Sequence, residues 1–452
     1  MWQNRSHPIG RDAKVPAMTN PVSRDTAAAS PGLYTQSVPT GGFANPRGGF
    51  LFFLGFAAVG TAMALLVPAV LTISLKATVI DPANAGTIVS IAVAVGALFS
   101  LVALPLFGRI SDRITSRTGR RRPLLVLGAL LIAIGAVVTF ASSTTAVLTV
   151  GSVFTQVGFA AATVAVTSVI PDQFEPLKRG PASSIVGVSL PVGAVIGLFI
   201  AQLFSPTLSL MILVPAAVGV VGILLFAIVL KDRQFSRKQR PPFTVVSFFS
   251  TFWVNPVKSP AFAWAWWSRF LLFFGVAAVQ AYQALYLIFV LHFSPQDVAG
   301  AVFLSTLVLT IAALIFAAIA GRVSDRIGRR KPFVMASSVL FAIGLLIAAN
   351  ANSFPSFLLA IGVVGVGQGI YFAVDLALVT QVLPDPDNPA KDMGVIGLAN
   401  TLPSSLVPAI APAILAIGAT AALTANYSAL FIAGAIAAVI GAVLVLPIRG
   451  VK

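Results

Sequence analysis

A short motif occurs twice in this chain, as GRISDR at residues 108–113 and as GRVSDR at residues 321–326. The copies are separated by close to half of the chain's 452 residues. Each copy follows a long apolar run and precedes a basic cluster that ends at a proline. A second match keeps the same spacing, with VIPD at residues 169–172 and VLPD at residues 382–385. The sequence therefore predicts two similar halves arranged in parallel along the chain.

The composition is that of a membrane protein. Hydrophobic residues make up 58% of the chain, charged residues 9%, and the mean hydropathy is +0.97. Apolar stretches of about 20 residues, enough to cross about 30 Å of hydrocarbon, recur from residue 50 onwards. Backbone groups in lipid must be satisfied within the spanning segment, so an all-α integral membrane protein with twelve transmembrane helices in two six-helix bundles is predicted. The predicted spans are residues 50–75, 86–107, 123–142, 147–170, 183–204, 208–230, 263–291, 298–320, 332–349, 355–382, 394–418 and 427–448.

The formal net charge of +16 reflects orientation in the membrane. Of the 29 Lys and Arg residues, all but Lys76 and Arg269 fall in the termini or in alternate loops between the predicted spans. This asymmetry is the positive-inside pattern, which predicts a multi-pass protein of the cell (inner or plasma) membrane with both termini in the cytoplasm. The basic residues do not form one face of a folded domain, so no nucleic-acid partner is predicted.

The chain divides into four predicted segments. Residues 1–47 are rich in Pro, Ser, Thr, Ala and Gly and lack a periodic apolar face, which predicts a disordered cytoplasmic tail. Residues 48–230 form the predicted N-terminal bundle, and residues 263–452 form the C-terminal bundle. Residues 231–262 are a predicted cytoplasmic central loop. Within that loop, apolar residues over 243–253 are compatible with a short helix at the inner membrane surface.

Composition and motifs favour no catalytic chemistry. The chain has no cysteine, which excludes disulfides and thiolate metal sites. His7 lies in the predicted tail and His292 near the end of a predicted span. Because these are different parts of the predicted protein, the two histidines do not indicate a metal cluster. The sequence shows no phosphate-binding glycine loop and no pattern for a nucleophile triad. We therefore expect no enzyme, no metal and no cofactor.

Residues 108–123, GRISDRITSRTGRRRP, resemble the loop between helices two and three of the major facilitator superfamily. The form SDR-x-x-SR-x-GRRRP is most similar to the sucrose/proton symporters and the wider glycoside–pentoside–hexuronide symporters. Tyr371–Asp375, with Lys391–Asp392 and Pro403, also resembles the second half of bacterial members of that group. The resemblance covers about residues 50–450 and implies transport by alternating access.

The repeated motif is a candidate gate. The resemblance implies that Asp112 faces the start of helix eleven and Asp325 the start of helix five, which would stabilise an outward-open form. A carboxylate at a helix end also neutralises the positive end of a helix or pairs with a nearby Arg, and glycine permits close backbone approach. Alternatively, these charges only anchor helix ends and set the topology. The candidate gating residues are Gly108, Asp112, Arg113, Arg117, Gly119, Arg120, Gly321, Asp325, Arg326, Gly328 and Arg329.

Asp375 and Arg269 are candidate proton-coupling residues. Asp375 lies well inside the tenth predicted span, and Arg269 lies about as deep in the seventh. Ionisable groups in hydrocarbon are costly and point to function, and pairing would lower the cost of burying both. Protonation of Asp375 would then release Arg269. Alternatively, Arg269 snorkels to the interface. The equivalent position in the first half is Ala162, so facilitated diffusion without coupling stays open.

Polar and aromatic residues on the seventh and tenth spans form a candidate solute site. Sugar binding needs amide groups for hydroxyl pairs and an aromatic face for the ring. Gln280, Gln283 and Tyr286 follow one another at a spacing of three, which is typical of one helix face. Hydrogen bonding between helices is the alternative role for such residues. The candidate solute-binding residues are Gln156, Gln280, Tyr282, Gln283, Tyr286, Gln368, Tyr371 and Asn400.

Three functions remain open on these observations. The first is proton-coupled symport of a sugar or similar small solute by alternating access. The second is proton-driven export of drugs or metabolites, which the polar-poor first half favours because it suits an amphipathic solute. The third is a membrane solute sensor that does not transport, for which an ordered signalling domain would be expected. The expected partners are a small-molecule solute, protons and the lipid bilayer, and the expected state is a monomer.

Overall fold

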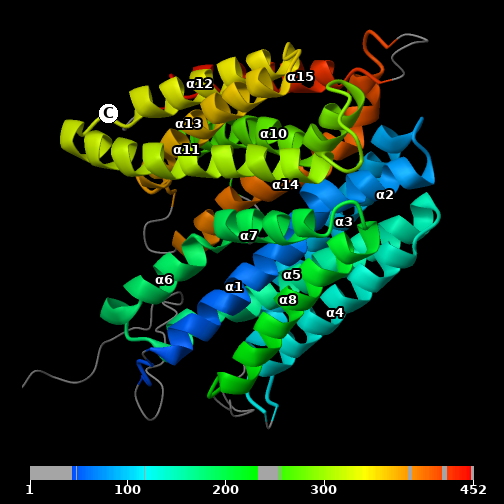
Figure 1. Ribbon diagram of the computed structural model, residues 1–452. Coiled ribbons are helices and arrows are strands. Elements are labelled where there is room, and N and C mark those ends of the chain that lie inside the picture. Colours follow the sequence, from blue (N-terminus) through cyan, green and yellow to red (C-terminus); the bar gives the residue numbers. More distant parts are fainter. Residues whose placement is uncertain are drawn as a thin grey trace, which may run out of the picture. The chain divides into compact units, whose positions relative to one another are not determined.

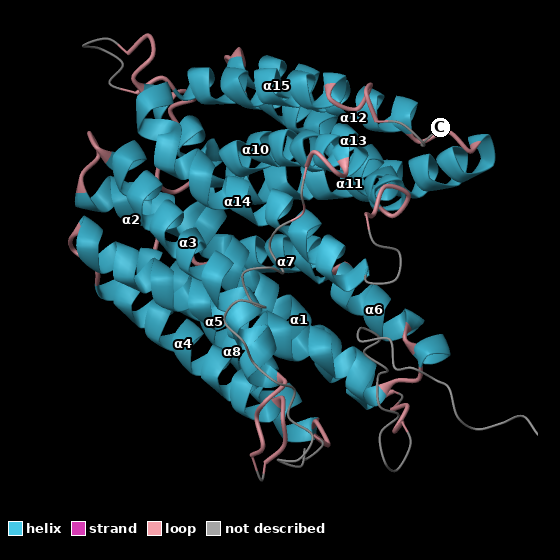
Figure 2. Ribbon diagram, turned by 180° about the vertical axis from the view of Figure 1, so that it is seen from behind, coloured by secondary structure: helices cyan, strands magenta, loops and turns pink. Residues whose placement is uncertain are grey.

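The computed structural model describes residues 43–46, 48–116, 118–232, 254, 256–384, 389–419 and 425–448. Helices make up the regular structure of these residues (Figure 2), together with an isolated β-bridge between Ser116 and Gly119. The predicted tail up to residue 42, Arg117 and the predicted short helix over 243–253 lie outside the described residues.

The helices of residues 49–229, called the first half here, follow the predicted spans. α1 continues through a π-helical turn, η1, into α2, and α6 meets α7 at a bend of 44°. A single-turn 3-10 helix, Pro176–Lys178, precedes α6. The elements are α1 (Gly49–Val67), η1 (Pro68–Thr72), α2 (Ile73–Ile80), α3 (Ala85–Ser111), α4 (Arg122–Ala141), α5 (Thr145–Gln173), α6 (Gly180–Gly187), α7 (Ser189–Leu203) and α8 (Leu208–Val229).

The helices of residues 260–443, called the second half here, repeat the pattern of the first. The elements are α10 (Pro260–Phe289), α11 (Val298–Ile327), α12 (Lys331–Ala349), α13 (Phe354–Val379), α14 (Pro389–Leu415) and α15 (Tyr427–Val443).

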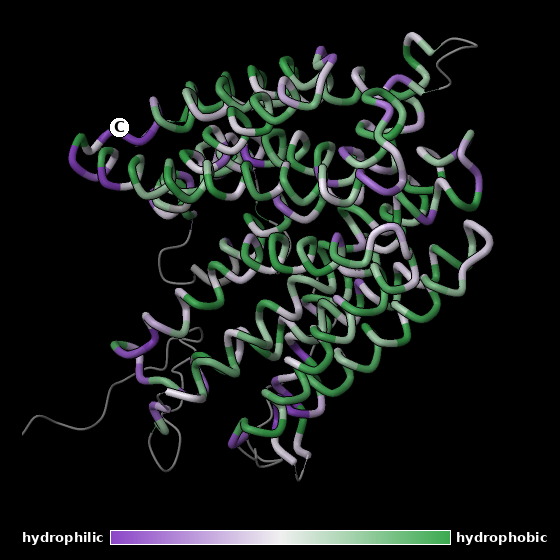
Figure 3. The backbone as a smooth tube through the Cα atoms, viewed as in Figure 1, coloured by the Kyte–Doolittle hydropathy of each residue, from purple (hydrophilic) through white to green (hydrophobic). Residues whose placement is uncertain are grey.

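The predicted all-α fold is confirmed. Ten of the helical segments are long and apolar enough to span a membrane, α6 and α7 together make an eleventh, and α15 coincides with the twelfth prediction. Figure 3 shows hydrophobic residues along the helices and hydrophilic residues concentrated near their ends. The predicted boundary at residue 320 is wrong, because α11 continues through the second motif to Ile327. Gly328 then ends the helix in the left-handed conformation, with φ of 67°.

The ordered chain before α1 differs from the predicted tail, which extended to residue 47. The side-chain amide of Asn45 donates to Glu175 at 2.8 Å, and its oxygen accepts from the backbone N–H of Glu175 at 3.0 Å. Lys178, hydrogen-bonded to Glu175, and the Asn45 amide hold the pKa of Glu175 below its usual value. These bonds fix residues near the first span to the end of α5.

Close helix packing within each half depends on glycine. A Cβ on Gly60 of α1 would lie 2.8 Å from the carbonyl oxygen of Gly219 on α8. In the second half, a Cβ on Gly369 of α13 would lie 2.2 Å from the carbonyl oxygen of Ala313 on α11. Small residues at such crossings allow backbones to approach, which is how helices associate where lipid supplies little hydrophobic driving force.

Consecutive spans run in opposite directions, so the loops fall at two ends. The end that carries residues 112–121, 174–179, 328–330 and 380–384 is called the motif end. The opposite end, called the far end, carries residues 81–84, 142–144, 204–207, 290–297 and 350–353. The far end is where the two halves meet.

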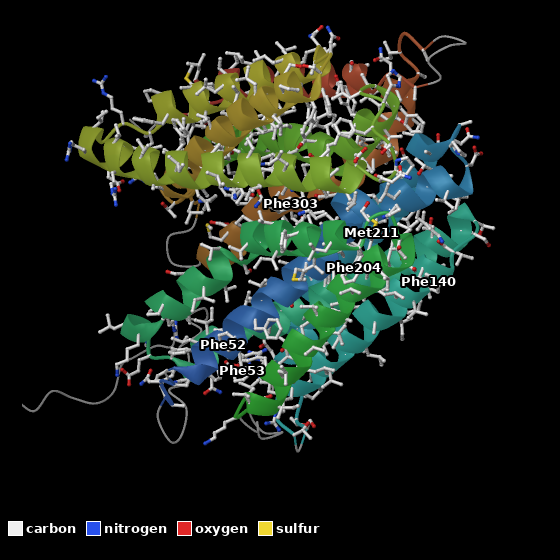
Figure 4. The ribbon with its side chains drawn as sticks, in the orientation of Figure 1. Phe52, Phe53, Phe140, Phe204, Met211 and Phe303 are labelled. Atoms are coloured by element: carbon white, nitrogen blue, oxygen red, sulfur yellow. The ribbon has the colours of Figure 1, made fainter. Side chains whose placement is uncertain are left out.

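Contacts between the halves join α3 to α14 and α7 to α11. The rings of Phe199 and Phe303 lie 5.5 Å apart, and Phe303 is labelled in Figure 4 on the side of α11 that faces α7. Ser205 in a far-end loop donates to the carbonyl oxygen of Gln296 in another, at 2.8 Å. Figure 1 shows the halves converging near α2 and separating towards α6.

Several glycines near the motif end have open space beside them. Nothing lies within 4 Å of the position that a Cβ would take at these residues, which belong to α3, α6 and α14. The described residues are therefore packed across the halves at the far end but not at these faces near the motif end. The glycines are Gly108, Gly180, Gly187, Gly394 and Gly397.

Candidate functional site

A cavity of about 110 Å³ lies between the two halves. Its walls come from α1, η1, α3 and α5 of the first half and from α10 and α14 of the second, near the middle of these helices. Most of the lining side chains are apolar, and none carries a charge. The lining residues are Leu65, Leu66, Ala69, Val93, Ala97, Ser100, Leu101, Leu104, Gln156, Phe159, Ala277, Gln280, Ala281, Thr401, Ser404 and Pro408.

Two glutamines supply the amide groups of this cavity, one from each half. Gln280 belongs to α10, and Gln156 belongs to α5. Gln156 passes close to α3 because Gly96 has no side chain: a Cβ there would lie 3.1 Å from the Gln156 Cγ atom. Ser100, Thr401 and Ser404 add hydroxyl groups to the lining.

A polar cluster of α10, α13 and α14 lies within the second half. The Arg269 guanidinium donates through Nη1 to the Asp375 carboxylate and through Nε to the Asn400 side-chain oxygen, the latter at 2.5 Å. The side chains of Arg269 and Asp375 are 12% and 6% exposed. The Arg269 Cζ atom also lies 5.7 Å from the centre of the Phe273 ring. The structure thus brings together the two ionisable residues that the sequence placed inside the spans.

Pairing explains how these charges are accommodated. An isolated buried charge costs several kcal/mol, and removal of one partner of a buried pair typically destabilises a protein by about 3–5 kcal/mol. Asn400 was predicted at the solute site, but here its side chain contacts Arg269. The next residue of α14, Thr401, does line the cavity.

Other predicted solute-binding residues do not line the cavity. The Tyr282 hydroxyl lies 2.6 Å from the Ser90 hydroxyl at the contact between halves. Tyr286 donates to the backbone carbonyls of Ala348 and Ala351, and its ring lies among aromatic residues of the second half. Gln283 is buried in the same helix. The spacing of polar residues could not identify which face of α10 lines the cavity. In this helix 78% of the membrane-spanning window is buried, so nearly every face contacts protein.

The remaining two predicted residues lie on α13. Tyr371 is buried, with its ring centre 6.5 Å from that of Phe273, on the side of the polar cluster. Gln368 is half-buried and does not line the cavity. Neither Gln368 nor Tyr371 therefore lines the cavity.

The first motif forms an ionic cluster at the motif end. Arg120 donates to Asp112 at 2.6 Å, and Arg121 donates to Asp172 at 2.7 Å. Arg121 is 3% exposed and also donates to the Ser111 hydroxyl. Asp172, at the end of α5, belongs to the repeated VIPD segment, and this repeat is the sequence signal that marks it.

Asp232, just after α8, fixes the loop before α4. Its carboxylate accepts from the backbone N–H groups of Arg121 and Arg122, at 2.5 and 2.8 Å, as an acid does at a helix N-terminus. Gly119 has φ of 108°, and a Cβ there would lie 2.4 Å from Asp232 atoms. Both its backbone conformation and its surroundings therefore require glycine.

The second motif repeats two of these contacts. Arg330, which matches Arg121 in the GRRRP and GRRKP segments, donates to the carbonyl of Ala377 near the end of α13. Lys331 donates to the carbonyl of Ile448, as Arg122 donates to that of Leu230 at 2.6 Å. The repeated segments thus make similar contacts in each half: Arg121 and Arg330 bind near the end of the fourth span, and Arg122 and Lys331 bind just past the end of the last span.

The gating aspartates contact their own halves in this structure. Asp325 lies 3.9 Å from Arg330 and is 76% exposed. Asp112 pairs with Arg120 and Arg121.

The other gating candidates lie around these aspartates. A Cβ on Gly321 of α11 would lie 3.9 Å from the Ala373 side chain on α13, which is ordinary packing distance. Arg326 and Arg329 are exposed. Arg113 lies two residues after the end of α3, and Arg117 lies outside the described residues.

The comparisons with known proteins identify the family. The model of the Major Facilitator Superfamily matches residues 48–320 and residues 303–452, which together include the helices of both halves. The chain belongs to the Major Facilitator Superfamily. It is therefore a multi-pass membrane protein of a transporter family rather than an enzyme. The resemblance of this facilitator to the sucrose/proton group stays a prediction.

Two curated relatives match a short part of this facilitator. An uncharacterized MFS-type transporter, YfiU of Bacillus subtilis (strain 168), is 32% identical over 101 residues, covering 22% of this chain and 19% of the relative. The multidrug resistance protein MdtL of Shewanella sp. (strain ANA-3) is 36% identical over 92 residues, covering 20% of this chain and 22% of the relative. The chain thus matches about a fifth of the length of each.

Solved structures share the fold over nearly the whole chain. The nucleoside transporter NupG has a TM-score of 0.71 and 12% identity, with 88% of this chain and 100% of that chain covered. The peptide transporter POT has a TM-score of 0.67 and 18% identity, with 88% and 95% covered. At such identities the likeness shows the major facilitator fold alone.

Proposed function

We propose that this facilitator is a proton-driven exporter of amphipathic organic compounds. The proposal is carried by one observation: the same molecule has both of the following features. A largely apolar, uncharged cavity lies between the halves, and a buried Arg269–Asp375 pair lies beside it in the second half.

The cavity lining supports an amphipathic solute. Leucine, alanine, valine and phenylalanine side chains make up most of the wall, and such a surface favours apolar parts of a ligand. The polar groups are two amides and three hydroxyls, which orient a ligand without supplying charge. A solute with many hydroxyl groups would leave several of them unpaired against this wall, at about 1–3 kcal/mol each.

The Arg269–Asp375 pair supports proton coupling. A proton that binds the Asp375 carboxylate removes its negative charge and weakens its bond to the guanidinium. Arg269 then keeps the Asn400 oxygen as an acceptor. The cluster thus has two states that differ by one proton, and a transporter needs such a difference to link proton movement to conformational change.

Two further points support export. The distribution of basic residues predicts that the motif end faces the cytoplasm, and a solute reaching the cavity from that end would then come from inside the cell. MdtL, which is similar over part of the chain, is a multidrug resistance protein.

Symport of a sugar with protons is a second candidate. Gln156 and Gln280 support it, because paired amides from opposite halves suit a ring with adjacent hydroxyls. The loop at residues 108–123 resembles that of sucrose/proton symporters.

Purified protein in liposomes that contain a pH-sensitive dye tests these proposals. With the lumen acidic, addition of an amphipathic cationic or neutral dye on the other side should produce proton efflux if solute and protons are exchanged. Symport would instead move protons inward with a disaccharide. Asp375→Asn should abolish either signal.

Asp297→Asn is the matched control, because it removes a carboxylate from an exposed far-end loop, where Asp297 is bonded to Ser294. Proton flux unchanged in Asp375→Asn but lost in Asp297→Asn would contradict the coupling role. Solute movement at equal rates with and without a pH gradient would contradict proton coupling altogether.

A further inference from the structure

We propose that Asn400 is a positioning residue that links the solute cavity to the Arg269–Asp375 pair. This inference rests on the proposed function, because it concerns how solute and proton sites communicate. It assigns Asn400 to the coupling machinery rather than to direct contact with solute.

The first observation is the division of the Arg269 guanidinium between two acceptors. One edge, through Nη1, faces the Asp375 carboxylate on α13. The Asn400 oxygen on α14 accepts a hydrogen bond from the Nε–H of Arg269, at 2.5 Å. The orientation of the guanidinium towards Asp375 therefore depends on an amide that does not itself titrate. Tyr371 on α13 is a further titratable side chain beside Arg269.

The second observation is the place of Asn400 along α14. Thr401 directly follows it, and Thr401, Ser404 and Pro408 line the cavity. These three positions are spaced as on one face of a helix. A rotation of α14 that improves contact with a solute at Thr401 would also move the Asn400 oxygen relative to Arg269. The two sites are thus connected through adjacent residues of one helix.

The third observation concerns how α14 is held. Near the motif end, Trp266 donates to the carbonyl of Val395 at 2.9 Å, which ties this part of α14 to α10. Towards the far end, α14 packs against α3 of the first half. Pro403 lies between these contacts, and a proline inside a helix removes one backbone hydrogen bond and permits a bend. Asn400 therefore lies next to the point where α14 can change direction between the halves.

The expected consequence is a change in coupling without a loss of solute binding. With Asn400 in place, Arg269 keeps an acceptor when Asp375 takes a proton, so the two protonation states interconvert. Without it, Arg269 depends on Asp375 alone, and proton binding to Asp375 becomes less favourable. Because the relay runs through Asn400, solute at Thr401 would also lose its influence on the pair.

The experiment compares proton flux with solute flux in proteoliposomes for Asn400→Ala and Thr401→Ala. Asn400→Ala should lower the number of protons moved per solute by about tenfold, the range of ordinary coupling between sites, while equilibrium binding of a fluorescent amphipathic dye changes by less than about threefold. Thr401→Ala should weaken dye binding and keep the wild-type ratio. Tyr371→Phe should also keep that ratio, because the phenol is not the coupling group.

A double substitution tests whether the two positions act through Arg269. Asp375→Asn alone should lose proton coupling. Asp375→Asn combined with Asn400→Asp returns a carboxylate to the other side of the guanidinium and should restore part of the proton flux. A residue with only a packing role would give no such rescue.

The outcomes separate this inference from the proposed function. If Asp375→Asn abolishes the flux while Asn400→Ala keeps the wild-type ratio and the double variant stays inactive, Asn400 is not a positioning residue but the coupling role of Asp375 stands. If Asp375→Asn itself keeps the wild-type ratio, the proposed function fails, and the relay through Asn400 fails with it.

Discussion

The Ser90 hydroxyl on α3 and the Tyr282 hydroxyl on α10 lie 2.6 Å apart, in a buried hydrogen bond that crosses from the first half to the second. Both residues lie in the part of the bundle towards the far end, where the halves also meet through Phe199 and Phe303. Opening of the far end requires α3 and α10 to separate. If the cavity opens alternately to the two sides, as the family resemblance implies, this bond breaks each time the far end opens.

Tyr282→Phe should favour the form that is open at the far end. A hydrogen bond of this kind contributes about 1 kcal/mol, which corresponds to about a fivefold shift in the populations. Because the chain has no cysteine, Ser404→Cys in the cavity would supply a unique thiol. The rate at which a membrane-impermeant maleimide added on the far-end side modifies that thiol should rise by about the same factor.

Tyr286→Phe is the control for this measurement. Its hydroxyl donates to carbonyls of Ala348 and Ala351 within the second half, so its loss should not change the balance between forms. Equal acceleration of labelling by both substitutions would show that the Ser90–Tyr282 bond has no special role in closure.

Gly119→Ala should destabilise the first half. Alanine at this position would adopt φ of 108° and place its Cβ 2.4 Å from atoms of Asp232. Strained backbone of this kind costs about 1–3 kcal/mol, so the unfolding temperature in detergent, followed by tryptophan fluorescence, should fall by several degrees. Gly108→Ala, where nothing lies within 4 Å, should not lower it, because alanine favours a helix more than glycine does. Equal effects of the two substitutions would argue against the packing described for the motif loop.

Arg121→Ala should be far more damaging than Arg326→Ala. Arg121 is 3% exposed and joins Asp172 to the motif loop, whereas Arg326 is exposed at the end of α11. Breaking a buried pair typically costs about 3–5 kcal/mol, while a change at an exposed site stays within about 0.5 kcal/mol. Thermal unfolding of the two purified variants measures the difference. Similar unfolding temperatures for the two variants would show that the buried Arg121–Asp172 pair does not stabilise the motif end.

Gln280→Leu distinguishes the two candidate solutes. For an amphipathic solute held mainly by the apolar wall, transport should fall by less than about threefold, because the substitution keeps an apolar surface of similar size. For a sugar, loss of an amide that pairs with hydroxyls should cost about 1–3 kcal/mol, or at least about fivefold in affinity. Uptake of labelled dye and of labelled disaccharide by the same liposomes measures the change in transport for each solute.

The fold of this transporter can be predicted from its sequence to a large extent. Apolar stretches of spanning length determine where helices form, because backbone groups have no other partners in hydrocarbon. The repeated motif predicts two similar halves, and the structure shows the repeat as equivalent contacts: Arg121 and Arg330 each bind near the end of a span in their own half. Helix ends are predicted less well, since α11 continues through its motif to Ile327.

The candidate site required the tertiary structure. The depth of Asp375 and Arg269 in their spans predicted that the two could meet, because depth follows from position along a helix. Sequence spacing could not tell which side of the nearly buried α10 faces the cavity, so Gln280 lines it while Tyr286 packs into the second half. Nor could it show that Asn400 reaches Arg269. Position along a helix is set by the local sequence, whereas the neighbours of each face are set by how helices distant in the chain pack together.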